Sequence, residues 1–129
     1  MTGKLVYRFT VAGRLCGLNE FIAAGHSKFG GNRVKREAEA LITSFLPKRR
    51  PEIKYPVWVS IDYYEPSNRR DHDNVQFAIK FIMDAMVKAG MLINDTRKYV
   101  LGSTPKVRTD KDNPRIEVSV HEAEESQLG

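Results

Sequence analysis

Asn-Arg-Arg-Asp-His-Asp-Asn, at residues 68–74, separates two segments of different periodicity. Before it, residues 56–64 alternate between apolar and polar side chains, a pattern that predicts a half-buried β-strand. After it, apolar side chains recur at intervals of three and four over residues 73–89, which predicts an amphipathic helix that ends at Gly90. The heptapeptide is therefore expected to be a polar loop that leads from a strand into a helix.

The same two periodicities predict the remaining elements on either side of this loop. Further strands are expected at residues 5–11, 99–101 and 115–121, and further helices at residues 20–24 and 33–45, capped by Asn19 and Asn32. The order β-α-α-β-α-β-β is typical of an α/β or α+β fold, with a small mixed sheet of about four strands and helices packed on it. A chain of 129 residues has room for one domain, assigned to residues 1–121, followed by a frayed tail at residues 122–129.

The composition is that of an ordinary globular protein with an excess of basic residues. The formal net charge of +5 fits a partner rich in phosphate groups, although many proteins carry a similar charge. Cys16 is the only cysteine, so an internal disulfide and a zinc site built from several cysteines are excluded. Because no apolar run is long enough to cross a membrane and no signal peptide is recognisable, we expect a cytoplasmic protein without a membrane contact.

Three aspartates are the candidate metal ligands. Asp71 and Asp73 lie two residues apart in the heptapeptide, and Asp95 follows the predicted helix. Aspartates at a helix start are usually caps, and neighbouring arginines alone could compensate two adjacent carboxylates. A cap needs only one carboxylate, however, whereas several carboxylate oxygens are the ligands that a hard cation such as Mg²⁺ prefers. A divalent cation at this place would acidify a bound water and stabilise charge on a phosphate, which is sufficient for phosphodiester hydrolysis.

Lys80 also allows two interpretations. It lies two turns after Asp73 on the predicted helix, and Asp84 follows it by four residues. Lys80 and Asp84 at this spacing can form an ordinary surface ion pair, which is the interpretation that the spacing favours. In a functional interpretation, the Lys80 ammonium group stabilises the charge that develops on a leaving group.

Basic residues recur in several segments near these aspartates. Each segment alone is typical of a solvated surface, but their recurrence is better explained by contact with a phosphate backbone. The residues expected to contact DNA are Arg69, Arg70, Lys28, Arg33, Arg97 and Lys98.

Taken together, these motifs resemble the RusA family of Holliday-junction resolvases, small endodeoxyribonucleases commonly carried by prophages. The resemblance rests on Arg-Arg-Asp-His-Asp-Asn at 69–74, Asp-Ala-Met at 84–86, Ala-Gly at 89–90, Asn-Asp at 94–95 and, near the start, Gly-Leu-Asn-Glu-Phe at 17–21. The similarity covers most of the chain. The order of the motifs is fairly specific as a set, whereas no single motif is.

The resemblance implies a Mg²⁺- or Mn²⁺-dependent endonuclease in bacterial or phage-infected cells that resolves four-way junction DNA as a homodimer. It implies that Asp71, Asp73 and Asp95 hold the metal and take part in catalysis. A helix lysine also acts in the family, and Lys80 is the match for it here.

The sequence departs from the family pattern at two positions. Phe77, not a lysine, stands four residues after Asp73, and Asn94 stands where the family is often acidic. Two other functions therefore stay open. One is a phage DNA-binding protein that has kept the fold without cleavage, and the other is a nucleotide phosphohydrolase with a small enclosed pocket.

Overall fold

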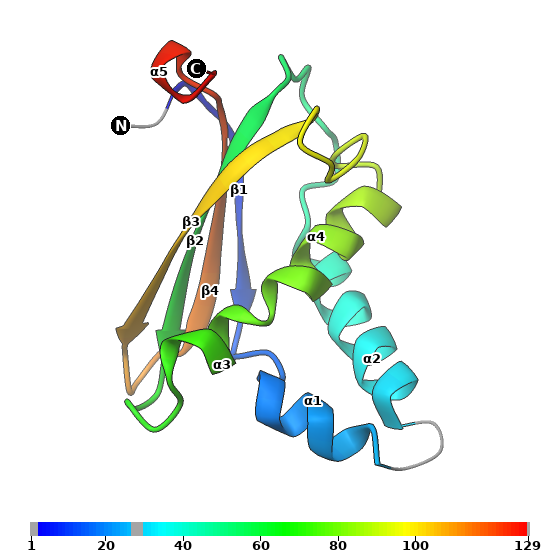
Figure 1. Cartoon of the computed structure of the whole chain (residues 1–129), viewed down its shortest axis with the longest axis vertical. Helices are drawn as coiled ribbons and strands as arrows, with labels where there is room; N and C mark the ends of the chain where they lie inside the picture. Colours follow the sequence, from blue (N-terminus) through cyan, green and yellow to red (C-terminus); the bar gives the residue numbers. More distant parts are fainter. Residues whose placement is uncertain (1–2, 27–29, 129) are drawn as a thin grey trace.

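A four-stranded mixed sheet forms one layer of the protein (Figure 1). The computed structural model describes residues 3–26 and 30–128. The strands are β1 (Leu5–Ala12), β2 (Val57–Glu65), β3 (Val100–Thr109) and β4 (Arg115–Glu122), in the spatial order β1-β4-β2-β3. Strand β4 runs antiparallel to both of its neighbours, and β3 runs parallel to β2. This arrangement leaves β1 and β3 as the two edges of the sheet.

Alternation along β2 and β4 gives the sheet one apolar and one polar face. Val59, Ile61 and Tyr63 of β2 are buried, as are Val118 and Val120 of β4. The intervening side chains, including paired Asp62 and Glu117, are only partly buried and form the opposite face. The predicted inward face of β2 is therefore confirmed, and the predicted fold class of a small mixed sheet with helices packed on it is confirmed as well.

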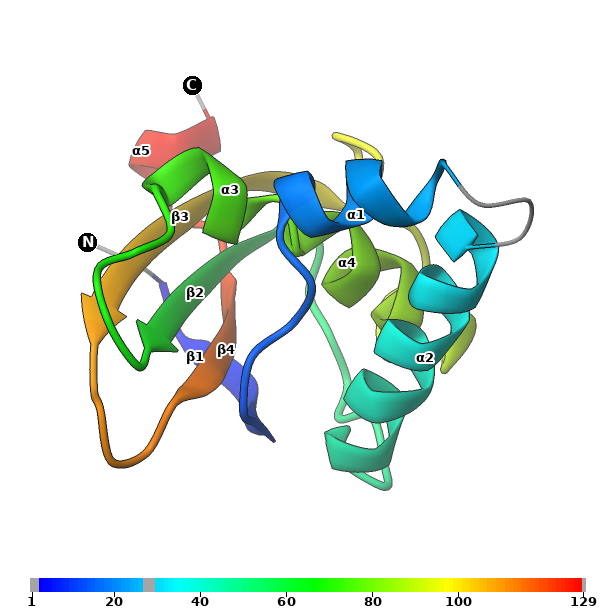
Figure 2. The same cartoon turned by 90° about the horizontal axis from the view of Figure 1, so that it is seen from below.

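Helices α1 to α4 form the second layer, on the apolar face (Figures 1 and 2). Their bounds are Leu18–Ala24 for α1, Gly30–Phe45 for α2, His72–Gln76 for α3 and Ile79–Lys88 for α4. Helix α2 packs against α4 and β1, while α3 lies against β3. In the part of the chain that is described, no helix is long and apolar enough to cross a membrane.

The single helix predicted over residues 73–89 is instead two helices joined by a turn. The Ala78 amide donates to the Val75 carbonyl at 3.2 Å, and the Phe81 amide donates to the Ala78 carbonyl at 3.0 Å, so the chain tightens at Phe77 and Ala78. Val75 and Ile82 are buried on the two sides of this turn. Because both halves bury the same face, the spacing of apolar residues does not reveal the break. Gly90, with φ +78°, ends α4 as predicted.

Other bounds also differ from the predictions. Strand β3 has ten residues where only 99–101 were expected, because it is an edge strand whose polar and proline positions break the usual pattern. Helix α1 begins after Gly17 rather than after Asn19, and α2 already includes Asn32. Strand β4 extends to Glu122, and the expected frayed tail contains a short helix, α5 (Glu125–Leu128).

Candidate functional site

Asp71 and Asp73 lie at the start of α3 with their carboxylates exposed. Asp71 occupies the N-cap position in an extended conformation, but its side chain makes no capping hydrogen bond. Asp73 accepts a hydrogen bond on Oδ1 from the backbone amide of Asn74 at 3.0 Å. Neither carboxylate forms an ion pair with any described residue. A purely structural Asp71 would cap the helix or pair with an arginine. Its side chain does neither among the described residues.

Arg70 turns away from the aspartates and toward buried Glu65 at the end of β2. Its Nε lies 2.8 Å from Glu65 Oε1, and its Nη2 lies 2.7 Å from Glu65 Oε2. Its Nη1 donates to Glu20 Oε1 at 2.8 Å and to the Leu15 carbonyl at 3.1 Å. The Arg70 side chain is only 11% exposed. The hydrogen bonds that Arg70 donates to Glu65 raise the pKa of the Arg70 guanidinium, which stays charged. Within the fold Arg70 thus holds the loop, and its expected contact with DNA stays a prediction.

Two further contacts attach the same loop to the start of α1. The Asn74 carboxamide accepts a hydrogen bond from the Asn19 backbone amide at 3.0 Å. A Cβ atom at Gly17 would lie 2.6 Å from Asn74 Oδ1 and 2.8 Å from Arg70 Nη1. A side chain at position 17 would therefore have to displace Asn74 or Arg70 from its present position. The loop that carries Asp71 and Asp73 is consequently fixed on both sides, by Arg70 before it and by Asn74 after it.

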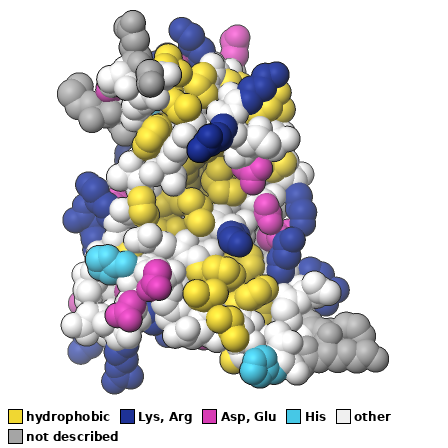
Figure 3. Space-filling model, in the orientation of Figure 1, with side chains coloured by type: hydrophobic (Ala, Val, Ile, Leu, Met, Phe, Trp, Pro, Cys, Tyr) yellow, Lys and Arg dark blue, Asp and Glu magenta, His cyan; other side chains and the backbone are white. Residues whose placement is uncertain are grey.

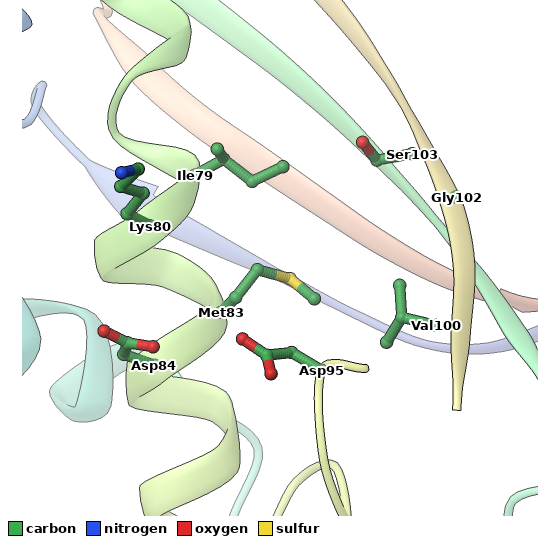
Figure 4. Close-up of a pocket in the computed structure, with 8 residues that line it drawn as sticks. All are labelled: Ile79, Lys80, Met83, Asp84, Asp95, Val100, Gly102 and Ser103. Carbon is green, nitrogen blue, oxygen red and sulfur yellow. The ribbon is translucent and has the colours of Figure 1, made fainter. Parts of the chain in front are cut away.

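Asp95 lies elsewhere, in a pocket of about 360 Å³ between α4 and the edge strand β3 (Figure 4). Ile79 and Met83 extend from α4 toward Val100 of β3, and Asp95 approaches from the loop after α4. Figure 3 shows hydrophobic side chains gathered in the hollow on this side of the molecule, with acidic and basic side chains around them. The pocket therefore has an apolar floor and a charged rim.

Lys80 lines the rim of this pocket together with Asp84. The surface pair expected between these two residues is not the contact that Asp84 makes, since Asp84 Oδ2 lies 3.7 Å from Lys35 Nζ. Lys80 Nζ instead lies 5.8 Å from the centroid of the Phe77 ring. The fold thus brings Lys80 and Asp95 to one pocket.

The three candidate ligands are not gathered at one point of this chain. Among residues 3–26 and 30–128, no group of three or more His, Cys, Asp or Glu side chains is arranged to hold a metal ion. Asp95 lies in the pocket between α4 and β3, whereas Asp71 and Asp73 lie at the start of α3. Asp71 and Asp73 precede α4 in the chain, and Asp95 follows it.

The other predicted DNA contacts are mainly exposed. Arg69, Arg97 and Lys98 are exposed, and Lys98 Nζ lies 5.4 Å from the Tyr99 ring centroid. Arg33 Nε lies 3.9 Å from Glu37 Oε1, in an exposed ion pair on α2. Lys28 lies outside the described residues. These positions are compatible with a basic surface but do not by themselves define one binding site.

Sequence reasoning missed Glu65 and Glu20, the residues that fix Arg70. Glu65 continues the inward face of β2 two residues after Tyr63 and is 3% exposed. A charge at an inward position requires a charged or hydrogen-bonded partner, so this alternation contained a usable signal. Arg70, the partner of Glu65, is only five residues away in the chain, whereas the other contacts of Arg70, Leu15 and Glu20, lie about fifty residues away and were not readable.

No protein-family model matches the chain, and no curated protein matches it significantly.

Proposed function

We propose that this protein is a metal-dependent, structure-selective endodeoxyribonuclease of the RusA type that resolves Holliday junctions. The observation that carries the proposal is the state of Asp71 and Asp73. They are two exposed carboxylates on a loop that is fixed from both sides, and neither forms an ion pair with a described residue. Two like charges two residues apart in the chain, with no ion-pair partner, favour the binding of a cation.

The donor set fits Mg²⁺ or Mn²⁺, because carboxylate oxygens are the preferred ligands of both ions. When bound, such a cation supplies an acidified water and stabilises charge on the phosphate oxygens. Asp71 and Asp73 would hold it, with Asp95 as a third ligand. Arg70 and Asn74 fix the position of the two carboxylates. Lys80, on the rim of the pocket that contains Asp95, would balance the charge on the leaving oxygen.

We further propose that the third carboxylate comes from a second copy of the chain. The turn at Phe77 and Ala78 redirects the helix, yet no group of three ligands forms within the described residues of one chain. In a closed two-fold dimer, Asp95 of one copy can approach Asp71 and Asp73 of the other. Two such sites would suit a substrate in which two strands are cut symmetrically.

The direct test incubates the protein with a labelled four-way junction and with a linear duplex of the same sequence, with and without Mg²⁺. We expect cleavage of the junction only, and only with the metal. Asp73→Asn should abolish cleavage while junction binding is retained or strengthened, since the variant removes a charge that repels phosphates. Asp112→Asn is the matched control, because Asp112 is an exposed aspartate in the turn between β3 and β4. Equal cleavage by the Asp73 and Asp112 variants would refute the catalytic assignment.

A non-catalytic DNA-binding protein on this fold is the second candidate. This candidate needs no metal site, so it accounts for the absence of a three-ligand group in the described part of one chain without a second subunit. This candidate predicts salt-dependent junction binding that is unaffected by Mg²⁺ and by Asp73→Asn, with no cleavage at any metal concentration. The same incubation therefore distinguishes the two functions.

A further inference from the structure

The face of the sheet that points away from the helical layer is not covered by any of the helices α1 to α4 (Figures 1 and 2). The residues that point outward on β2 and β3 pair in register, as Trp58 with Gly102, Ser60 with Thr104, Asp62 with Lys106 and Tyr64 with Arg108. None of them is Val, Leu, Ile or Met, and none is buried. The core of a protein–protein interface is depleted of charged residues, so this face is better suited to a polar, charged occupant.

Trp58, the only tryptophan of the chain, lies over β3 on this face. A Cβ atom at Gly102 would lie 2.6 Å from Trp58 Cη2 and 2.7 Å from Trp58 Cζ3, so the indole ring occupies the space above Gly102. The ring nitrogen Nε1 donates a hydrogen bond to Thr104 Oγ1 at 2.8 Å. Because Trp58 is only partly buried, the side of the ring that is turned away from Gly102 stays accessible.

Two cationic side chains follow on the same side of β3. Lys106 is four residues after Gly102, which is about 13 Å along a strand. It is exposed and forms no ion pair with any residue in the ranges 3–26 and 30–128. Arg108 is 49% exposed, and its Nε lies 3.6 Å from Asp62 Oδ1 in a pair that is weak in water. Trp58, Lys106 and Arg108 therefore form an aromatic and cationic row along the edge of the sheet, called the β3 row below.

The carboxylates of this face are balanced within the fold. Asp62 has Arg108 beside it, and Glu117, its register partner on β4, lies 2.8 Å from Arg115 Nε. The Arg115 guanidinium also lies 3.8 Å from the centroid of the Tyr64 ring and occupies one side of it. The accessible aromatic surface and the unpaired cation are consequently both on the β3 side of the face, away from Glu117.

We propose that the β3 row binds a single strand of nucleic acid, with one base stacked on Trp58 and backbone phosphates beside Lys106 and Arg108. A single strand offers both complementary parts, since its unpaired bases have free flat faces and its backbone is negatively charged. A duplex offers the charge alone, because its bases are paired and stacked inside the helix. The inference goes beyond the proposed function, since Asp71 and Asp73 lie at the start of α3, on the helical side of the sheet.

The fluorescence of Trp58 measures this binding directly, because the chain has no other tryptophan. The protein is titrated without divalent metal with oligothymidylate, with oligouridylate and with a linear duplex, each of about 12 nucleotides or base pairs, a length within the range that such surfaces bind. We expect saturable quenching by the single strands and none by the duplex. The tighter of the two single strands distinguishes DNA from RNA as the ligand.

Variants separate stacking from charge, with affinity measured by the anisotropy of a labelled oligonucleotide. Trp58→Ala should lose roughly tenfold in affinity, and Trp58→Phe, which keeps an aromatic ring, should recover most of it. Lys106→Ala/Arg108→Ala should reduce the salt slope by about 1.4, which is about 0.7 for each single-strand phosphate. The matched control, Lys48→Ala/Arg49→Ala, removes the same two charges from exposed positions between α2 and β2 and should leave the slope unchanged.

Equal changes in the two double variants would overturn the inference, because they would reflect net charge alone. Equal quenching by the duplex would overturn it as well, since no base would then be stacked on Trp58. Trp58 fluorescence that ignores every oligonucleotide but changes when a dimer is diluted to monomers would instead assign this face to a second copy of the chain. Junction cleavage without single-strand binding would refute this inference and leave the nuclease, whereas single-strand binding without cleavage would do the reverse.

Discussion

Arg70 and Glu65 form a two-pronged ion pair, with Nε 2.8 Å from Oε1 and Nη2 2.7 Å from Oε2. The pair joins the loop before α3 to the end of β2, where the Glu65 side chain is only 4% exposed. Hydrogen bonds between such charged, planar partners are stronger and more directional than neutral ones. The pair also directs Arg70 away from Asp71 and Asp73, which leaves both carboxylates without an arginine partner.

Glu65→Gln should lower the free energy of unfolding by about 3 kcal/mol, because it removes the buried counter-charge and leaves the largely buried Arg70 guanidinium with only the exposed Glu20 carboxylate. Urea denaturation measures the change. Asp62→Asn is the matched control on the same strand, since Asp62 belongs to an exposed pair with Arg108 and should cost about 1 kcal/mol or less. Identical unfolding midpoints for the two variants would contradict a stabilising role of the buried pair.

The thiol of Cys16 reports on the same contacts. Burial raises the pKa of the Cys16 thiol, the charge of Glu20 raises it further, and Arg70 opposes this effect. Because a thiol reacts as its thiolate, alkylation by iodoacetamide at pH 8 should be slower in the folded protein than in urea. Glu20→Gln removes the charge that raises the pKa of the thiol, so the pH midpoint of alkylation should fall and the rate at pH 8 should increase.

Glu37→Gln is the control for that experiment. Glu37 lines the same pocket as Cys16 and Glu20 but does not shift the pKa of the thiol. It should leave the pH midpoint unchanged. A midpoint that moves equally in both variants, or that rises in Glu20→Gln, would be inconsistent with the observed arrangement of Glu20 and Arg70 around Cys16.

The local pattern of β2 predicted its two faces well, because alternation over nine residues directly reports which side is buried. The end of α4 at Gly90 was also predictable, since its positive φ suits glycine. The turn at Phe77 was not, because the apolar spacing continues across it. Ring contacts of Phe77 with Phe21 and Phe81, at 5.2 and 5.5 Å, stabilise this region through a residue distant in sequence.

The candidate site was predictable as a set of residues and not as a geometry. The spacing of Asp71 and Asp73 singled out the loop, and the structure leaves both exposed. The structural role of Arg70 could not be predicted from the sequence, because its partners come from β2, from α1 and from the loop before α1. The parallel pairing of β3 with β2 along residues 100–109 was also not predictable, because the expected strand covered only residues 99–101.

Lys80→Ala should slow junction cleavage more than it weakens junction binding, because Lys80 shares the pocket with Asp95 and is not used by Asp84. The measurement compares single-turnover cleavage rates with dissociation constants. Lys88→Ala is the control on the same helix, and its Nζ lies 2.6 Å from Glu39 Oε1. A Lys80 variant that loses rate and affinity equally would mark Lys80 as a general surface cation.

Mixing two inactive variants tests whether the active sites are shared between subunits. Asp73→Asn and Asp95→Asn should each abolish cleavage as homodimers. If Asp95 of one subunit completes the site formed by Asp71 and Asp73 of the other, the heterodimer contains one intact site and one doubly damaged site. The mixture should therefore regain nicking of one junction strand, measured on a denaturing gel.

The expected recovery is partial, since random exchange makes about half of the dimers heterodimers, each with one working site. Exchange itself is verified with subunits that carry different affinity tags. A control mixture of Asp71→Asn with Asp73→Asn should stay inactive, because both substitutions damage the loop of their own chain and neither heterodimer site is then complete. Recovery in neither mixture, despite verified exchange, would place Asp71, Asp73 and Asp95 in a site formed by one chain. Recovery in both would show that Asp71 and Asp73 do not act together on one metal.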